Sequence, residues 1–75
     1  MPSFIINKNA QPKSGEYEVH NTTKGCSYMP KPENQIALGV HADCHGAVAQ
    51  AKQSYPNEKS KINGCYYCCN PCHTG

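Results

Sequence analysis

The sequence predicts a small α+β fold in the order β-β-α-β, with a hairpin, one helix and a short third strand, stabilised by a metal ion. Three observations support this: apolar alternation near the N-terminus, a helical apolar stripe in the second half, and six cysteines of which four lie close together. Leu, Ile, Val and Phe total only nine of 75 residues, too few for a conventional core. The formal charge of +2 argues against disorder, so we expect residues 1–75 to form a single zinc-stabilised domain.

The predicted hairpin joins residues 3–8 to residues 16–20. The first segment begins with the β-favouring run Phe-Ile-Ile, and the second alternates with period two. The connection over residues 9–15 contains Pro12 and Gly15, which form turns. In the second strand Val19 and His20 should face opposite sides, so His20 requires either a bend or a site on the outer face.

A loop, a helix and a short strand should follow. Residues 21–34 contain Gly25 and two prolines that disfavour regular structure. Asp43 is a suitable N-cap for a helix to about Tyr55, because an apolar stripe follows it at helical spacing: Cys44, Val48, Ala51 and Tyr55. Pro56 ends that helix, and Ile62 begins the third strand.

The cysteine cluster is the most informative feature of the chain. Residues 64–75 read Gly-Cys-Tyr-Tyr-Cys-Cys-Asn-Pro-Cys-His-Thr-Gly, which contains two overlapping Cys-x-x-Cys pairs at the spacing of a metal-binding knuckle. Because Cys68 and Cys69 are adjacent, they should have different roles. We take Cys65 and Cys68 as the principal knuckle. For the remaining candidates Cys69, Cys72 and His73 four alternatives stay open: a second metal site, disulfides, free thiols or a frayed tail.

The upstream candidates differ in strength. Cys26 lies in a loop and is favoured as a further thiolate ligand. Cys44 lies on the apolar helix stripe, so we interpret it as a small buried hydrophobic residue. The alternative is metal ligation, because the start of a helix lowers the pKa of a cysteine in the first turn. His41 and His45 flank Cys44 and are interpreted as surface histidines.

The order of these features resembles the Ada-type metal-binding module. The resemblance consists of a strand with His20, a loop with Cys26, a helix containing Ala-Val-Ala-Gln-Ala-Lys at residues 47–52, and Gly-Cys-Tyr-Tyr-Cys at residues 64–68. That module is a small zinc domain whose first ligands lie between hairpin and helix and whose last two form Cys-x-x-Cys. Its first pair is normally two cysteines, whereas here Cys26 follows His20 by six positions.

The chain is also similar, over residues 17–74, to short uncharacterised bacterial proteins that end in Gly-Cys-x-x-Cys-Cys-x-x-Cys-His-Thr. Together these resemblances imply one Zn²⁺ held by Cys65, Cys68, Cys26 and, as first choice for the fourth ligand, His20. Phosphotriester repair of the Ada type would fall to Cys26, but the chain has no arginine with which to build a DNA-repair surface.

The composition favours a protein partner over nucleic acid. All seven basic residues are lysines spread along the chain, whereas Tyr28, Tyr66 and Tyr67, with neighbouring lysines, are suitable interface anchors. The sequence therefore predicts a non-catalytic structural-zinc module that binds a protein. A thiol/redox protein using Cys-x-x-Cys and a secreted disulfide-rich scaffold remain alternatives.

The sequence contains few features typical of enzymes or of membrane-spanning proteins. We recognise no nucleotide fingerprint, Ser-His-Asp constellation or paired carboxylates. The N-terminus lacks a basic segment followed by a long apolar stretch, and no apolar run approaches membrane-spanning length. These features predict a cytoplasmic location.

Overall fold

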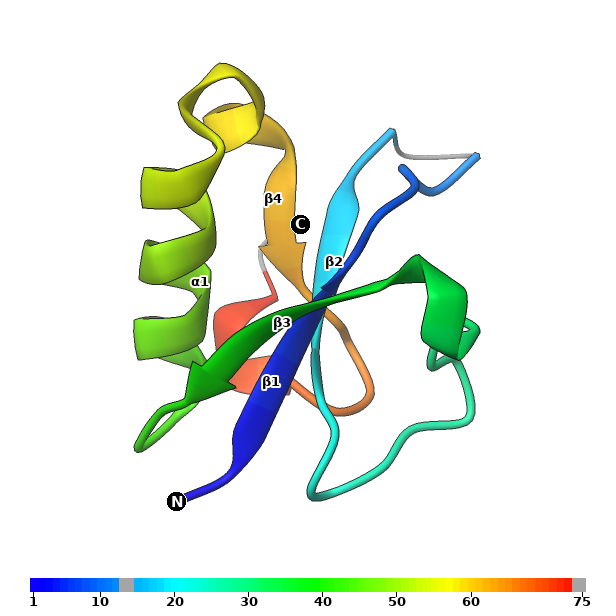
Figure 1. The fold of residues 1–75 in the computed structure, drawn as a ribbon, viewed down its shortest axis with the longest axis vertical. Helices are drawn as coiled ribbons and strands as arrows, with labels where there is room; N and C mark the ends of the chain where they lie inside the picture. The colour runs from blue at the N-terminus through cyan, green and yellow to red at the C-terminus, as the bar shows by residue number, and fades with distance from the viewer. Residues whose placement is uncertain (13–14, 74–75) are drawn as a thin grey trace.

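The computed structural model describes residues 1–12 and 15–73, which form a four-stranded mixed sheet with one helix beside it (Figure 1). The strands and the helix are β1 (Ser3–Asn7), β2 (Tyr17–Asn21), β3 (Gln35–Val40), α1 (Cys44–Ser54) and β4 (Ile62–Gly64). The described residues also contain three 3₁₀ turns: η1 (Pro32–Asn34), η2 (Pro56–Lys61) and η3 (Asn70–Cys72). Part of the predicted hairpin connection, residues 13–14, and the last two residues of the cysteine-rich phrase, 74–75, lie outside the described residues.

The strand order in the sheet is β3-β1-β2-β4. Strands β1 and β2 pair antiparallel, with Ile5 opposite His20, which confirms the predicted hairpin. Strand β4 pairs parallel to β2, with Val19 opposite Gly64. This parallel pairing carries the start of the cysteine cluster to the side of the hairpin.

The predicted α+β class is confirmed, but the prediction omitted β3. This strand pairs antiparallel with β1 and occupies one edge of the sheet. A period-two pattern of Ile36, Leu38 and Val40 marks it in the sequence. The pairing shifts between Phe4 and Ile5, where Leu38 is the extra residue of a bulge. Gly39 supplies the left-handed backbone, φ 81°, that follows this extra residue.

The core lies between the sheet and α1. Apolar residues from every strand meet the helix residues on one side of the sheet: Phe4, Ile6, Val19, Leu38, Ile62, Cys44, Ala47 and Ala51. The helix contributes mainly small side chains, which allow its backbone to approach the strands closely. Val48 and Tyr55 of the predicted stripe are partly buried against the same cluster.

Helix α1 begins and ends close to the predicted positions. Asp43 is the N-cap, and its side chain accepts a hydrogen bond from the backbone N–H of His45 at 2.9 Å. The helix ends before Pro56, the first residue of η2. Among the described residues no helix combines the length and the apolar character needed to cross a bilayer.

The segment after β4 turns back against the domain and ends beside the start of α1 (Figure 1). Gly64 makes this return possible, because a Cβ atom at Gly64 would lie 2.7 Å from Cβ of Cys72 and 2.8 Å from the carbonyl oxygen of Cys69. A frayed tail was one expectation for Cys69, Cys72 and His73. In the structure Cys69 is 1% exposed and His73 Nδ1 lies 3.0 Å from the carbonyl oxygen of Gly64.

Candidate metal centre

Four side chains with metal-binding atoms gather where β2 and β4 pass into their following loops. The ligand atoms of His20, Cys26, Cys65 and Cys68 all lie within 4.8 Å of one another. We call this group the S3N cluster, for its three sulfurs and one imidazole nitrogen. The structure thus brings together all four residues predicted as ligands, and the cluster is able to hold a metal ion.

Each member of the S3N cluster is positioned by the sheet or by a loop that leaves it. His20 stands opposite Ile5 on β2, on the sheet face away from Val19 and α1, and is fully buried. His20 therefore lies on the outer face of the sheet, within the regular pairing of β2 with β1. Cys26 lies in the loop that follows β2. Cys65 extends the parallel pairing, because its backbone N–H donates to the carbonyl oxygen of Val19 at 2.9 Å.

The atoms of the cluster are in direct contact. The sulfurs of Cys26 and Cys65 are 3.7 Å apart, and Sγ of Cys68 lies 3.4 Å from Nδ1 of His20. The backbone N–H of Asn21 donates to the sulfur of Cys68 at 3.4 Å, while Cys65 accepts from backbone groups of Cys68 and Tyr67. Backbone donors of this kind stabilise thiolates in a metal-binding knuckle and help to set the direction of the sulfurs.

Burial shifts the pKa values of three members of the cluster, Cys65, Cys68 and His20. It raises the pKa of the Cys65 thiol, although the backbone hydrogen bonds from Cys68 and Tyr67 act in the opposite direction. Burial also raises the pKa of Cys68 and lowers the pKa of His20. A neutral imidazole is the form that binds a metal. A divalent cation among the sulfurs would favour their deprotonation, reversing the effect of burial.

The second nitrogen of His20 has an unusual environment. Nε2 is buried without a hydrogen-bond partner among the described residues, and Oε1 of Glu18 lies 3.8 Å away. Burial raises the pKa of Glu18. A ligating histidine commonly directs its other ring nitrogen toward a carboxylate, so Glu18 is placed to orient His20. Glu18 was not among the predicted site residues, although period-two alternation places it on the same sheet face as His20.

Cys44 is buried, as its place on the helix stripe predicts, but it is not a free thiol: it forms a disulfide with Cys72. The helix stripe indicated burial and carried no information about the distant partner. The other four cysteines, Cys26, Cys65, Cys68 and Cys69, are free. Cys69 is buried beside the S3N cluster without belonging to it, in agreement with the different roles expected for adjacent cysteines.

The remaining histidines lie elsewhere. His41 contacts the carbonyl oxygen of Leu38 through Nε2 at 2.8 Å and packs against the ring of Phe4. His45 joins Cys44 and Cys72 in a second group of potential ligands. The prediction of His45 as a surface residue agrees with its 69% exposed side chain, but it did not anticipate that grouping.

Three exposed tyrosines form a surface beside the S3N cluster, and we call them the tyrosine patch: Tyr28, Tyr66 and Tyr67. The rings of Tyr28 and Tyr67 stack with centroids 4.3 Å apart, and Tyr66 meets Tyr67 edge-on at 5.2 Å. A hydrogen bond with the Tyr28 side chain raises the pKa of Tyr67. Because Tyr66 and Tyr67 lie between Cys65 and Cys68, the knuckle holds part of this surface directly.

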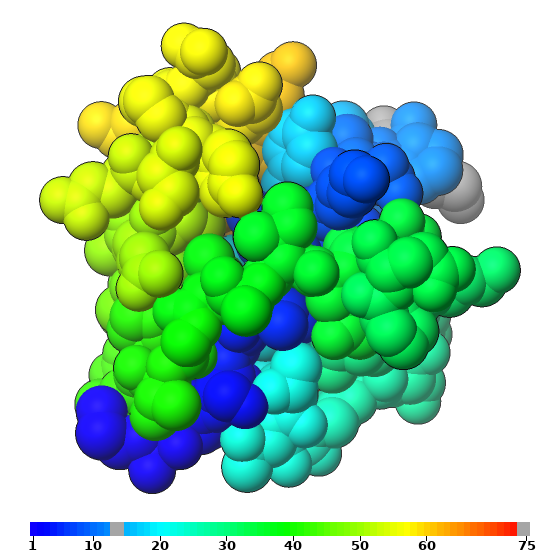
Figure 2. All heavy atoms as spheres, viewed as in Figure 1, coloured from blue at the N-terminus to red at the C-terminus, as the bar shows by residue number. Residues whose placement is uncertain are grey.

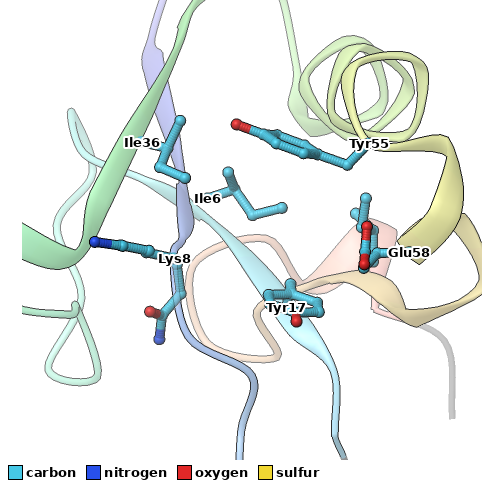
Figure 3. A pocket seen from close by; sticks show the side chains of 8 residues that line it. Ile6, Lys8, Tyr17, Ile36, Tyr55 and Glu58 are labelled. Atoms are coloured by element: carbon cyan, nitrogen blue, oxygen red, sulfur yellow. The ribbon is translucent and has the colours of Figure 1, made fainter.

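A separate cavity of about 230 Å³ opens near the end of α1. In Figure 2 a hollow is visible where the surfaces of the helix end, β3 and the hairpin meet. Figure 3 shows Tyr55 reaching across this cavity toward Ile36 and Ile6, with Lys8 and Glu58 at its margins. The lining is largely apolar and shares no residue with the S3N cluster.

Comparisons of this chain with protein-family models, with curated proteins and with solved structures found no match. The similarity to the Ada-type module therefore stays a prediction from the sequence.

Proposed function

We propose that the chain is a structural-zinc module in which His20, Cys26, Cys65 and Cys68 bind one Zn²⁺. The observation that carries this proposal is the convergence of these four ligand atoms within 4.8 Å. Three thiolates and an imidazole form a common structural zinc set, whereas Mg²⁺ and Ca²⁺ prefer oxygen ligands. The layout of the ligands, with a final Cys-x-x-Cys pair, follows the Ada-type arrangement that the sequence resembles.

The role of the zinc is to stabilise the fold. The core combines a few large apolar residues with alanines and cysteines, so it provides limited apolar burial. Structural zinc contributes on the order of 10 kcal/mol in small metallo-domains. The ion would join β2 and its following loop, through His20 and Cys26, to the segment after β4, through Cys65 and Cys68.

The tyrosine patch is the surface that we assign to a protein partner. Its three side chains are more than half exposed and pack against one another. Because these contacts already restrict the side chains, binding loses less of their conformational entropy. Tyrosine is enriched among the residues that contribute most to protein interfaces. A nucleic acid is the second candidate partner, since aromatic rings also stack on bases, but the sequence has no arginine to accompany them.

The geometry of the S3N cluster argues against a thiol/redox enzyme at Cys65 and Cys68. Both thiols are buried, and burial raises the pKa of each. A redox-active cysteine needs exposure and a lowered pKa. We therefore favour metal binding at this knuckle over thiol chemistry.

Native mass spectrometry of the purified chain tests the zinc proposal. The intact mass should exceed the mass after acid denaturation by one zinc ion. Chelation should remove this mass difference and, in the NMR spectrum, the dispersion of the amide resonances. Cys65→Ser should lose this zinc. Cys69→Ser is its matched control and should retain the zinc, because Cys69 is as buried as Cys65 but lies outside the cluster. A metal-free folded mass with three disulfides would contradict the proposal and favour the secreted scaffold.

A further inference from the structure

A second group of ligands lies at the start of α1. The sulfurs of Cys44 and Cys72 and a ring nitrogen of His45 are all within 4.8 Å of one another. The group shares no residue with the S3N cluster, and its two cysteines are joined in a disulfide. A disulfide cannot supply two thiolates, so the oxidised form closes this group to a metal ion.

We propose that Cys44, His45 and Cys72 form a second metal site, for a thiophilic divalent cation such as Zn²⁺, which opens when the disulfide is reduced. An external dithiol supplies the two electrons. The S–S bond of the chain breaks, each sulfur gains a proton, and the dithiol becomes a disulfide. The incoming cation then displaces the two thiol protons to solvent and takes both sulfurs as thiolate ligands, with His45 as the third.

The surroundings of His45 suit this role. Oδ1 of Asp43 lies 3.5 Å from Nδ1 of His45, while the same carboxylate caps the helix through the backbone N–H of His45. A carboxylate beside the ring of a ligating histidine helps to orient the imidazole. Asp43 therefore acts as a positioning residue.

Access separates this site from the S3N cluster. The side chains of His45 and Asp43 are 69% and 65% exposed, and Cys72 is half-buried, so a dithiol and an ion reach the group from solvent. Three protein ligands leave a fourth coordination position for water or another donor. A site of this kind holds its ion less tightly than a buried four-ligand site and responds to the redox state of its surroundings.

The test uses ¹¹³Cd²⁺ as the probe, on the full chain in both redox states. The oxidised chain should show the resonance of the S3N cluster alone. After treatment with a dithiol and its removal under argon, a second resonance should appear, shifted as expected for fewer sulfur ligands, with one additional equivalent of bound cadmium.

His45→Ala should remove the additional equivalent while leaving the oxidised spectrum unchanged. Gln50→Ala, another exposed polar residue of α1, is the control and should retain it. The proposal is overturned if reduction adds no cadmium, or if the added equivalent persists in His45→Ala. Failure of the S3N cluster is distinguishable, because it would remove the resonance of the oxidised chain and leave the His45-dependent signal intact.

Discussion

Nδ1 of His20 lies 3.4 Å from Sγ of Cys68, although 48 positions separate the two residues. The parallel pairing of β2 with β4 brings them together, since it places Cys65 beside Val19 and carries the following turn under His20. One strand pairing thus serves both the sheet and the candidate metal centre. Substitutions that disrupt the cluster and substitutions that disrupt the pairing of β2 with β4 should therefore both destabilise the fold and weaken metal binding.

Loss of a knuckle sulfur should unfold the domain. We expect Cys65→Ser and Cys68→Ser to lose zinc and amide dispersion, because each removes one of four ligands from a buried site. Cys69→Ser should retain zinc and lose only about 1 kcal/mol of stability, through lost packing. Circular dichroism and zinc stoichiometry measure both effects. Equal unfolding of all three variants would show that Cys69 also serves a structural site.

Removal of the imidazole should weaken metal binding specifically. His20→Ala should lower zinc affinity at least about tenfold in competition with a chromophoric chelator, because it removes a ligand. His41→Ala is the matched control: it removes another histidine that contacts the domain but lies outside both ligand groups. Unchanged affinity in His20→Ala would exclude the imidazole from the site.

Acid should release the metal from the S3N cluster. Burial raises the pKa of Cys65 and Cys68, so protons compete strongly for these sulfurs. Binding requires all three thiols to lose their protons, so apparent affinity should fall as pH falls, by up to about a thousandfold per unit below the thiol pKa values. Chelator competition between pH 8 and pH 6 measures the slope. A flat profile would contradict three-thiolate ligation.

The disulfide changes what substitution of Cys44 should do. A buried free thiol would cost about 1 kcal/mol on replacement by alanine. Because Cys44 is bonded to Cys72 across 28 positions, Cys44→Ala should instead lower the stability of the oxidised chain by about 3–4 kcal/mol. The difference should largely disappear under reducing conditions. Thermal and urea unfolding of both proteins, oxidised and reduced, measures it, and zinc at the S3N cluster should be retained.

The close approach at Gly64 provides a test of the packing. Gly64→Ala would place a methyl group against the backbone of Cys69 and the side chain of Cys72. We expect a loss of about 1–3 kcal/mol, because neither neighbour is a flexible side-chain end. Gly46→Ala is the comparison, since the atoms nearest to a Cβ at Gly46 belong to the His41 side chain, at 3.1 Å and beyond, and the change would raise helix propensity. Equal stability of the two variants would contradict the described packing.

The sequence was most informative where local rules apply. Alternation identified the hairpin, and Asp43 with the apolar stripe identified α1 to within one residue at each end. Strand β3 was missed although Ile36, Leu38 and Val40 alternate, because the strand depends on its pairing with β1 at the edge of the sheet. Local patterns contain little information about such pairings.

The same limit applies to the candidate site. Cys-x-x-Cys spacing identified Cys65 and Cys68, whereas the choice of His20 depended on a resemblance and not on its position in the strand. The structure brings His20 to the cluster from the sheet face opposite the helix. The pairing of Cys44 with Cys72 was beyond sequence reasoning, because it depends on how η3 lies against the start of α1.

The position of β4 in the sheet has a consequence for synthesis on the ribosome. Strands β1, β2 and β3 can associate early, but β2 lacks its parallel neighbour and the S3N cluster lacks two sulfurs until residue 68 has left the exit tunnel. Completion of the sheet, and any capture of zinc by all four ligands, would then wait for the emergence of this one short segment.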